Sequence, residues 1–397
     1  MVDEEFAWRL AAELVRIEST DPGCYEGNIE RHLKSLVEAK LGELPSWLAD
    51  AVEIRELEVL PGRRDLMVRV PGAGPEPALV YSCHMDTVTI GDGWGPETPP
   101  LAGRIVGDRL YGRGACDMKS GLACAVTALF ALLDRAAAAG ALPRRAFALL
   151  LSVDEEDFMR GIEAAIAAGW VGTDEWVVDT EPTDGQVQVA HKGRTWFEIT
   201  MRGETAHASQ PWKGADAVAA MAEVVCGLRR WCEALRALNE LGRSTITFGQ
   251  IEGGYRPYVV PDACKLWVDM RLVPPSSTAD ARAAVEAAVR AAEEHVPGTH
   301  GSYVVTGDRP PIERDPASPA LAALLAAAAA EGHPAEVGPF TGYTDTAVIA
   351  GTCANRNCMS YGPGSLALAH KPNEYVPRAD VLRAQRVLAR LAADICL

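Results

Sequence analysis

The chain has 397 residues, 48% of them hydrophobic, so it is long enough to form two domains with a core each. Its 54 acidic residues against 38 Lys and Arg give a net charge of −16, which argues against non-specific binding to nucleic acid or to an anionic membrane. We expect neither a signal peptide in the acidic start nor a membrane span in apolar stretches such as Ala320–Ala330. Ten cysteines without a CxxC pair are typical of reduced thiols, so we expect a cytoplasmic protein.

The first part of the chain leads to a short buried strand. Two segments with helical spacing, Phe6–Ile17 and Ile29–Val37, precede strand patterns at 52–57 and 66–70. The apolar run 78–83 then predicts a buried strand that ends at His84, with Asp86 two residues beyond. Imidazole is a good zinc ligand, and a nearby carboxylate can orient its ring. A His-x-Asp sequence alone is equally typical of a structural pair.

Three later stretches each deliver acids at the end of a strand or beside glycines. Asp117 lies between the glycines of 112–121, where it could equally be the N-cap of the helix that runs to about Arg135. A strand at 146–153 ends in a run of acids, which is often only a solvated helix start. Of two adjacent glutamates, one can instead bind a metal ion while the other stays free to act as a general base. The residues that these stretches supply are Asp117, Glu155, Glu156, Asp179 and Glu181.

The alternation of strands and helices predicts an α/β fold with a mainly parallel sheet, whose strand ends gather these acids at one edge. From 195 to 306 the order becomes β-α-β-β-α-β, which predicts an inserted ferredoxin-like α+β domain. We therefore expect a catalytic domain in two parts, 1–191 and 308–397, and an inserted lid and dimerisation domain at 192–307.

Seven stretches occur in the order and spacing of a known family. They are SCHMDTV, YGRGACDMKSG, DEE, TEPT, GETAHAS, YVVPD with DMR, and GPG followed by AHKPNEY. The chain resembles the M20 metallohydrolases, most of all the branch of acetylornithine deacetylase, succinyl-diaminopimelate desuccinylase and carboxypeptidase G2, and the likeness covers nearly its whole length. It implies a zinc-exopeptidase-like catalytic domain.

The resemblance implies two divalent metal ions, zinc by preference, with cobalt or manganese as alternatives. His84 and Glu181 would hold one ion, Glu156 and His370 the other, and Asp117 would bridge them. Hard carboxylates with two imidazoles suit such a pair. Asp86 would orient His84 and Glu155 would be the general base, while Asp179 is a competitor for the place of Glu181. A cis peptide bond between Asp117 and Met118 is also implied.

The resemblance gives roles to residues of the inserted domain as well. His207 would stabilise the oxyanion, reaching across a homodimer, although a lone loop histidine is more often simply exposed. Arg271 would bind a substrate carboxylate, with an ion pair to Asp269 as the alternative. Tyr258 stands where the family usually has Asn, which puts a direct transfer of substrate in doubt. Gly362 and Gly364 would form part of the pocket floor.

These observations favour a di-zinc hydrolase that cleaves the amide bond of an N-acylated amino acid. The alternative within the enzymes is an M20 dipeptidase or carboxypeptidase, and a more remote one is a non-catalytic binding protein on the same fold. We expect small-molecule substrates, no nucleic acid or membrane partner, and a homodimer. The acyl group, the amino-acid side chain, the pathway and the native metal do not follow from the sequence.

Overall fold

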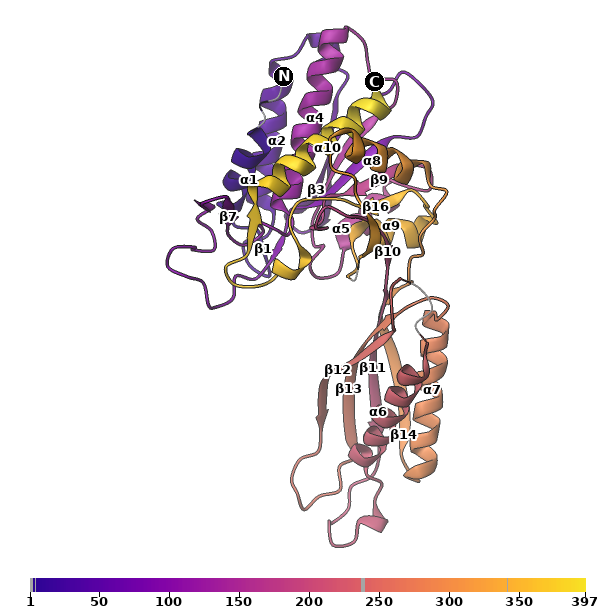
Figure 1. Ribbon diagram of the computed structural model, residues 1–397. Coiled ribbons are helices and arrows are strands. Elements are labelled where there is room, and N and C mark those ends of the chain that lie inside the picture. The colour runs from indigo at the N-terminus through magenta and orange to yellow at the C-terminus, as the bar shows by residue number, and fades with distance from the viewer. Residues whose placement is uncertain (1–2, 4, 237–239, 341) are drawn as a thin grey trace. The chain divides into compact units, whose positions relative to one another are not determined.

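The structure, a computed structural model, describes residues 3, 5–236, 240–340 and 342–397 (Figure 1). Its internal contacts divide the chain into two compact units. The large unit comprises Met1–Val189, Arg314–Gly338 and Thr344–Leu397, and the small unit comprises Ala190–Glu313 and Pro339–Tyr343. Most of the small unit is thus one continuous insertion in the sequence of the large unit.

Among the described residues, the large unit is built on an eight-stranded sheet of β2 (Glu53–Leu60), β3 (Arg63–Val70), β4 (Leu79–His84), β8 (Phe147–Ser152), β9 (Trp176–Asp179), β10 (Val187–His191), β15 (Val337–Phe340) and β16 (Cys358–Ser360). The strand order is β15-β10-β16-β9-β4-β8-β3-β2. The inner strands β16, β9, β4 and β8 are parallel, whereas β3 pairs antiparallel with β2 and β8, and β10 pairs antiparallel with β16. Every residue of β4 and β8 is buried, as expected for strands with both faces covered.

Helices pack on both sides of this sheet. α4 (Lys119–Ala139) and α10 (Arg378–Cys396) pack against each other and against β4 (Figure 1). α5 (Arg160–Ala167) packs on β2 and β3, and α9 (Asp345–Cys353) packs on β9 and β16. The remaining helices of the unit are α1 (Phe6–Val15), α2 (Gly27–Gly42), α3 (Ser46–Ala49), α8 (Pro319–Ala330) and the short η2 (Leu366–Leu368).

Helix α4 begins directly after Asp117 and Met118, so its packing fixes where that segment lies. It is rich in small and apolar residues and ends at Gly140, whose φ of 67° is the left-handed conformation that glycine adopts without penalty. Of the helices in the described ranges, α4 alone is long and apolar enough to cross a membrane by length and composition. Because 67% of its most apolar window is buried inside the unit, it has the character of a core helix.

Two small sheets join loops from distant parts of the large unit. In the first, β1 (Thr20–Asp21) pairs with β5 (Thr87–Val88), which brings the segment after α1 beside the segment after β4. In the second, β7 (Arg109–Tyr111) pairs with β17 (Tyr375–Pro377) and with β6 (Arg104–Val106). The second sheet therefore brings the glycine-rich segment 112–117 beside the segment 370–374.

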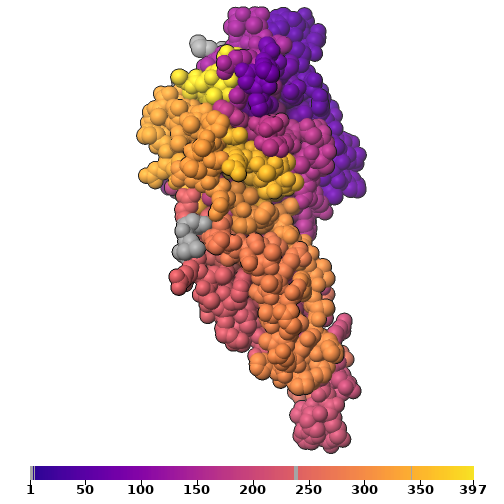
Figure 2. Space-filling model, turned by 90° about the vertical axis from the view of Figure 1, so that its right-hand side faces the viewer, coloured from indigo at the N-terminus to yellow at the C-terminus, as the bar shows by residue number. Residues whose placement is uncertain are grey.

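The small unit has the order β11, α6, β12, β13, α7, β14, with β11 at Gly193–Arg202, η1 at Pro211–Lys213, α6 at Ala217–Ala234, β12 at Thr245–Gly253, β13 at Ala263–Leu272, α7 at Thr278–His295 and β14 at His300–Arg309. Its strands form one antiparallel sheet in the order β12-β13-β11-β14. β13 alternates half-buried and buried residues along its whole length, so one face packs on the helices and the other does not. A capping box of Ser277 and Asp280 forms the N-terminus of α7. This helix faces the viewer in the orange part of the surface in Figure 2.

This architecture confirms the predicted α/β fold with its mainly parallel central sheet and the ferredoxin-like order of the insertion. The short strands β6, β7, β10 and β17 were not predicted. They contain three to five residues that alternate poorly, so periodicity could not distinguish them from loops.

Candidate metal centre

The sheet topology brings the candidate ligands together. β4 lies between β8 and β9 and is parallel to both, with His84 opposite Ser152 and Ser82 opposite Asp179. The carboxyl ends of these strands therefore share one edge, and the loops that follow them carry Glu155, Glu156 and Glu181. This is the edge at which open α/β sheets hold their ligands.

Asp117 lies between two imidazoles. Its Oδ1 is 3.2 Å from Nε2 of His84, and its Oδ2 is 3.4 Å from Nε2 of His370. Nε2 of His84 is also 3.6 Å from Oε1 of Glu181, and Nε2 of His370 is 2.9 Å from Oε2 of Glu156. The five predicted metal ligands thus form one cluster, divided by Asp117 into two sets.

The charges of this cluster depend strongly on one another. Burial raises the pKa of Glu156 and Glu181, and repulsion from Asp117 raises it further. Burial opposes ionisation of Asp117 too, yet its contacts with His370 and His84 hold its pKa well below the ordinary value. The same contacts with Asp117 and Glu156 raise the pKa of His370 to about 10. Several acids are therefore crowded into a buried space that positive charge would stabilise.

The donor set fits divalent metal ions. Donor atoms of His84, Asp117 and Glu156 lie within 4.8 Å of one another, and so do those of His84, Glu155 and Glu181. In the described part of the chain, Oε1 of Glu156 is buried without a hydrogen-bond partner. Buried polar atoms are normally satisfied, so an unpartnered carboxylate oxygen inside this cluster fits the role of a metal ligand. Imidazole nitrogens combined with carboxylates suit zinc and similar ions.

Glu155 lies in the cluster but differs from Glu156 in its contacts. Its side chain is buried, while its backbone N–H donates to Oδ1 of Asp86 over 3.2 Å. Burial raises the pKa of Glu155 well above its ordinary value, with His84 opposing this and Asp345 adding to it. Donor atoms of Glu155 lie within 4.8 Å of those of His84 and Glu181, so Glu155 stands beside the His84 set.

Asp86 contacts His84 differently from the expectation. Nδ1 of His84 lies 3.0 Å from the backbone carbonyl oxygen of Asp86 and 3.6 Å from its Oδ1. The carboxylate instead accepts the backbone N–H groups of Glu155 and Glu156, over 3.2 and 3.0 Å. Asp86 therefore holds the loop of the two glutamates at least as directly as it orients the imidazole.

Asp179, the competitor of Glu181, is directed elsewhere. Its Oδ2 accepts a hydrogen bond from the hydroxyl of Thr346, on α9, over 2.7 Å.

The two glycines predicted to line the pocket lie against the backbone of the site. A side chain on Gly362 would meet the carbonyl oxygens of Thr180 and Glu181 at 2.1 and 2.5 Å, so only glycine allows this close approach. Gly364 has a φ of 84° and lies against the thiol of Cys116. Both glycines thus let the backbone pack against the segments that carry Glu181 and Asp117.

The peptide bond between Asp117 and Met118 is cis, which confirms that expectation. Sequence reasoning did not find what holds this segment, an ion pair of Arg113 and Glu374 whose atoms lie 2.6 Å apart. Oε1 of Glu374 accepts the N–H groups of Cys116 and Asp117, over 2.8 and 3.1 Å. Arg113 and Glu374 both lie within the sequence motifs that contain Asp117 and His370, and this position was the only sign in the sequence that they could support the site. Their contact depends on the pairing of β7 with β17.

Of the small-unit candidates, His207 and Tyr258 lie on adjoining loops. The two loops are joined by hydrogen bonds from the N–H of Ala208 to the carbonyl of Tyr258 and from Val260 to Ala206, over 3.1 and 2.9 Å. Both side chains are exposed. Nδ1 of His207 accepts the backbone N–H of Ser209 over 3.2 Å, so the neutral ring carries its proton on Nε2. His207 can therefore present a donor to a bound group.

Arg271 forms the ion pair that was its alternative interpretation. Its Nε and Nη2 donate to the two carboxylate oxygens of Asp269, over 2.9 and 3.0 Å. Both residues are on the half-buried face of β13. This pairing occupies one edge of the guanidinium, so a substrate carboxylate would bind at the other edge or displace Asp269.

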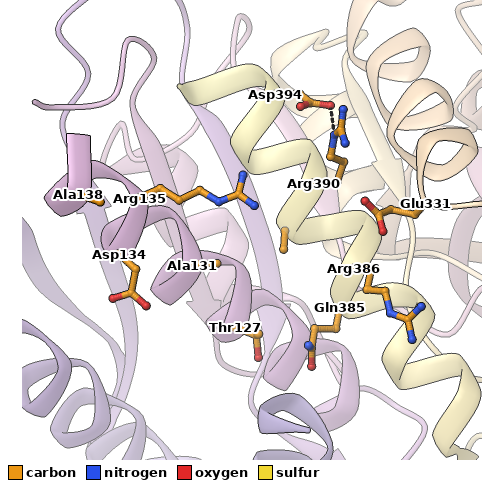
Figure 3. A pocket seen from close by; sticks show the side chains of 11 residues that line it. Thr127, Ala131, Asp134, Arg135, Ala138, Glu331, Gln385, Arg386, Arg390 and Asp394 are labelled. Atoms are coloured by element: carbon orange, nitrogen blue, oxygen red, sulfur yellow. Dashed lines mark hydrogen bonds and ion pairs between the residues drawn. The ribbon is translucent and has the colours of Figure 1, made fainter. Parts of the chain in front are cut away.

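A cavity of about 560 Å³ lies between α4 and α10, away from these residues (Figure 3). Its charged groups are partly paired, Arg390 with Asp394 and Asp134 with Lys40, each over 2.6 Å. The side chains that line it in the described chain include neither imidazole nor thiol. It is therefore a polar groove separate from the metal centre.

The comparison with protein families agrees with this geometry. Residues 80–394 match peptidase family M20/M25/M40. The chain belongs to this family. The match begins within β4 and ends within α10, so it includes every residue of the metal centre described above.

Curated relatives and solved structures resemble this M20 protein over nearly its whole length. An acetylornithine deacetylase from Myxococcus xanthus is 29% identical, with 80% of each chain covered. A probable succinyl-diaminopimelate desuccinylase from Staphylococcus epidermidis is 24% identical, with 95% of this chain and 94% of the relative covered. A dinuclear metal-binding M20 peptidase from Bacillus subtilis has the same fold, with a TM-score of 0.71 at 17% identity and 99% of each chain covered.

These findings confirm the predicted family and the prediction that the chain is a hydrolase of amide or peptide bonds. They do not support the reading as a non-catalytic binding protein.

Metal binding should release protons. His84 and His370 must be neutral to bind metal, and a pKa of about 10 means that His370 carries a proton at pH 7.5 in the metal-free protein. We expect chelator-treated protein to take up two zinc ions with proton release, and its affinity to rise as pH rises toward 10. Calorimetry in buffers of different ionisation enthalpy measures this, with His84→Ala and His370→Ala expected to lose affinity. Full metal occupancy in both variants would refute the ligand assignment.

Asp65 gives the large unit a second pH dependence. It is buried on β3, its Oδ1 accepts the N–H of Val153 over 3.0 Å, and burial raises its pKa from 3.8 to about 8. Between those pH values the folded state binds the proton that the unfolded state has released. Stability therefore falls as pH rises through this window, by at most about 1.4 kcal/mol per pH unit.

Asp65→Asn keeps the acceptor oxygen and cannot ionise, so its stability relative to the natural protein should increase from pH 5 to pH 8.5. Thermal unfolding at several pH values measures the difference. A difference that is constant with pH would show that Asp65 is ionised in the folded state throughout.

Proposed function

We propose that the protein is a di-zinc amidohydrolase that removes the acyl group from an N-acylated amino acid. The observation that carries the proposal is the position of Asp117, which has one carboxylate oxygen near each of two histidine-carboxylate sets, with Glu155 beside the set of His84 and Glu181. Paired metals with one bridging carboxylate are a recurrent arrangement in hydrolysis of amide bonds. His84 and Glu181 would hold one ion, His370 and Glu156 the other.

When bound, the two ions would polarise the scissile carbonyl and make water a better nucleophile near neutral pH. Glu155 would take the proton of the attacking water and deliver it to the departing amine nitrogen. Its burial supports this role, because a carboxylate with a raised pKa is a stronger base. The two ions would offset the acidic charge that surrounds it.

Stabilisation of the oxyanion falls to His207 in this proposal. The Nε2–H of its ring is available because Nδ1 is engaged by Ser209. An imidazole donor aimed at a developing oxyanion contributes in the transition state more than in the ground state. His207 would act on the site of the partner subunit.

For the substrate, a free carboxylate would bind at the open edge of Arg271, with Asp269 fixing the guanidinium in place. Tyr258 would lie at the acyl or side-chain end, next to His207 on the adjoining loop. The relatives named as a deacetylase and a desuccinylase favour an N-acyl amino acid. The neighbour named as a peptidase keeps a dipeptide as the second candidate.

A homodimer belongs to the proposal and is supported by the surface of the small unit. The small unit exposes large side chains with apolar rings or chains: Trp212, Tyr255, Tyr258 and Ile251 are 76%, 63%, 61% and 55% exposed. β12 is also an edge strand of its sheet, with most of its residues exposed. A cytoplasmic location is supported by ten free thiols.

The function is tested by hydrolysis of N-acetyl, N-succinyl and N-formyl amino acids beside dipeptides, with Glu155→Gln as the matched control. The Gln side chain keeps the size but cannot accept the proton, so kcat should fall by roughly 10²- to 10⁴-fold while fold and metal content persist. Near-normal turnover by this variant would exclude Glu155 as the base. Hydrolysis of dipeptides alone would favour the second candidate.

The action of His207 in trans is tested by complementation. His207→Ala and Glu155→Gln chains should each be nearly inactive, but a mixed dimer should contain one site with an intact base and an intact partner histidine. Activity should therefore return on mixing and reassembly, in proportion to the mixed dimer. If His207 acts within its own chain, every site carries one lesion and no activity returns.

A further inference from the structure

The loop that carries Glu155 and Glu156 is held by an unusual set of backbone contacts. Four successive N–H groups, from Val153 to Glu156, each donate to a buried carboxylate. The acceptors are Asp65 for Val153, Glu26 for Asp154, and Asp86 for both glutamates, with distances of 3.0, 3.2, 3.2 and 3.0 Å respectively. The position of the two glutamates therefore depends on acids from three other segments.

Asp154 needs this support more than its neighbours. Its φ of 66° lies in the left-handed region, which costs a non-glycine residue on the order of 1 kcal/mol or more. Its carboxylate is fully buried and contacts Arg160, whose Nε lies 2.6 Å from Oδ2. A residue held in this conformation immediately before Glu155 sets the direction in which Glu155 leaves the strand.

Arg63 holds the acceptor of the Asp154 N–H. Its side chain is buried on β3, and its Nε donates to Oε2 of Glu26 over 2.8 Å. Its Nη2 donates to Oε1 of Glu26 over 2.5 Å and to Oδ2 of Asp21 over 2.6 Å, while Nη1 lies 3.4 Å from Oδ1 of Asp154. The ring of Tyr25 lies over the guanidinium at 4.5 Å. The planar fork thus fixes three acids at once.

The acids Asp21, Glu26 and Asp86 also lie close enough together to hold a cation. The guanidinium already occupies the space between Asp21 and Glu26, however, so the group is an ion-pair network and not a second metal site. Without Arg63, Glu26 would be a fully buried carboxylate that has lost its cation, a strongly unfavourable state. It would take up a proton or turn away, and in either case the oxygen that accepts the Asp154 N–H would no longer be held in place by the guanidinium.

We propose that Arg63 is a positioning residue for Glu155, acting through Glu26 and Asp154 without touching substrate or metal. The inference rests on the proposed function, in which Glu155 is the general base. Loss of Arg63 frees the backbone at Asp154, so Glu155 spends less time in the position from which it accepts a proton. The effect falls on kcat, because the substrate-binding residues of the proposal are elsewhere in the chain.

The test compares Arg63→Met with the natural enzyme, both loaded with zinc, with activity expressed per metal-loaded site. We expect kcat to fall roughly 10- to 100-fold, the usual cost of removing a group that supports a metal-site residue, with KM within about twofold. Hydrogen exchange in the segment 152–158 should accelerate while that of α4 is unchanged. Arg63→Lys, which keeps the charge but not the fork, should recover part of the lost kcat.

Leu133→Ala is the matched control, because it removes buried contacts of α4 and lowers thermal stability far from the loop. Its kcat should stay normal below the unfolding transition. The inference is overturned if Arg63→Met keeps kcat within twofold, or if exchange in 152–158 does not change. If Arg63→Met does not fold, Glu26→Ala decides in the same way, since it removes the oxygen that accepts the Asp154 N–H while Arg63 keeps its ion pair with Asp21.

A failure of the proposed function can be distinguished from a failure of the inference about Arg63. If Glu155→Gln is active, Glu155 is not the base, yet the exchange measurement still decides whether Arg63 holds the loop.

Discussion

The shared contact of two imidazoles with the carboxylate of Asp117 is the interaction on which the rest of the site depends. It requires one acid to present both oxygens in opposite directions while buried at the end of a parallel sheet. Burial alone would neutralise such an acid, so opposite charge must stand close by on both sides. The two histidines supply that charge in the metal-free protein, and metal ions would supply it in the active one.

The same constraint explains the buried arginines around the centre. Gathering several acids at one sheet edge is costly unless each has a cation or a hydrogen-bond donor. Arg113 forms an ion pair with Glu374, which in turn accepts a hydrogen bond from the backbone N–H of Asp117. Arg63 forms a hydrogen-bonded ion pair with Glu26, which accepts a hydrogen bond from the backbone N–H of Asp154. In both places an arginine fixes a glutamate, and the glutamate fixes the backbone of a segment that carries a site residue.

The sequence was sufficient for the fold because strands and helices give local signals, whereas the choice of Glu181 over Asp179 and the place of His370 came from the resemblance to the M20 family. Buried strands such as β4 are continuous apolar runs, and the residues after them, such as His84, are chemically distinctive. The contacts of Glu374, Arg63 and Asp65 could not be predicted, since each depends on pairing between segments far apart in the chain. The pairing of Arg271 with Asp269 was foreseen only as an alternative, because residues two apart on a strand share a face but need not touch.

Anomalous diffraction at the zinc edge, from crystals of the zinc-loaded protein, tests the central claim most directly. The account predicts two peaks, one on each side of Asp117, the first beside His84 and Glu181 and the second beside His370 and Glu156. A single peak, or two peaks that do not share Asp117, would contradict the account.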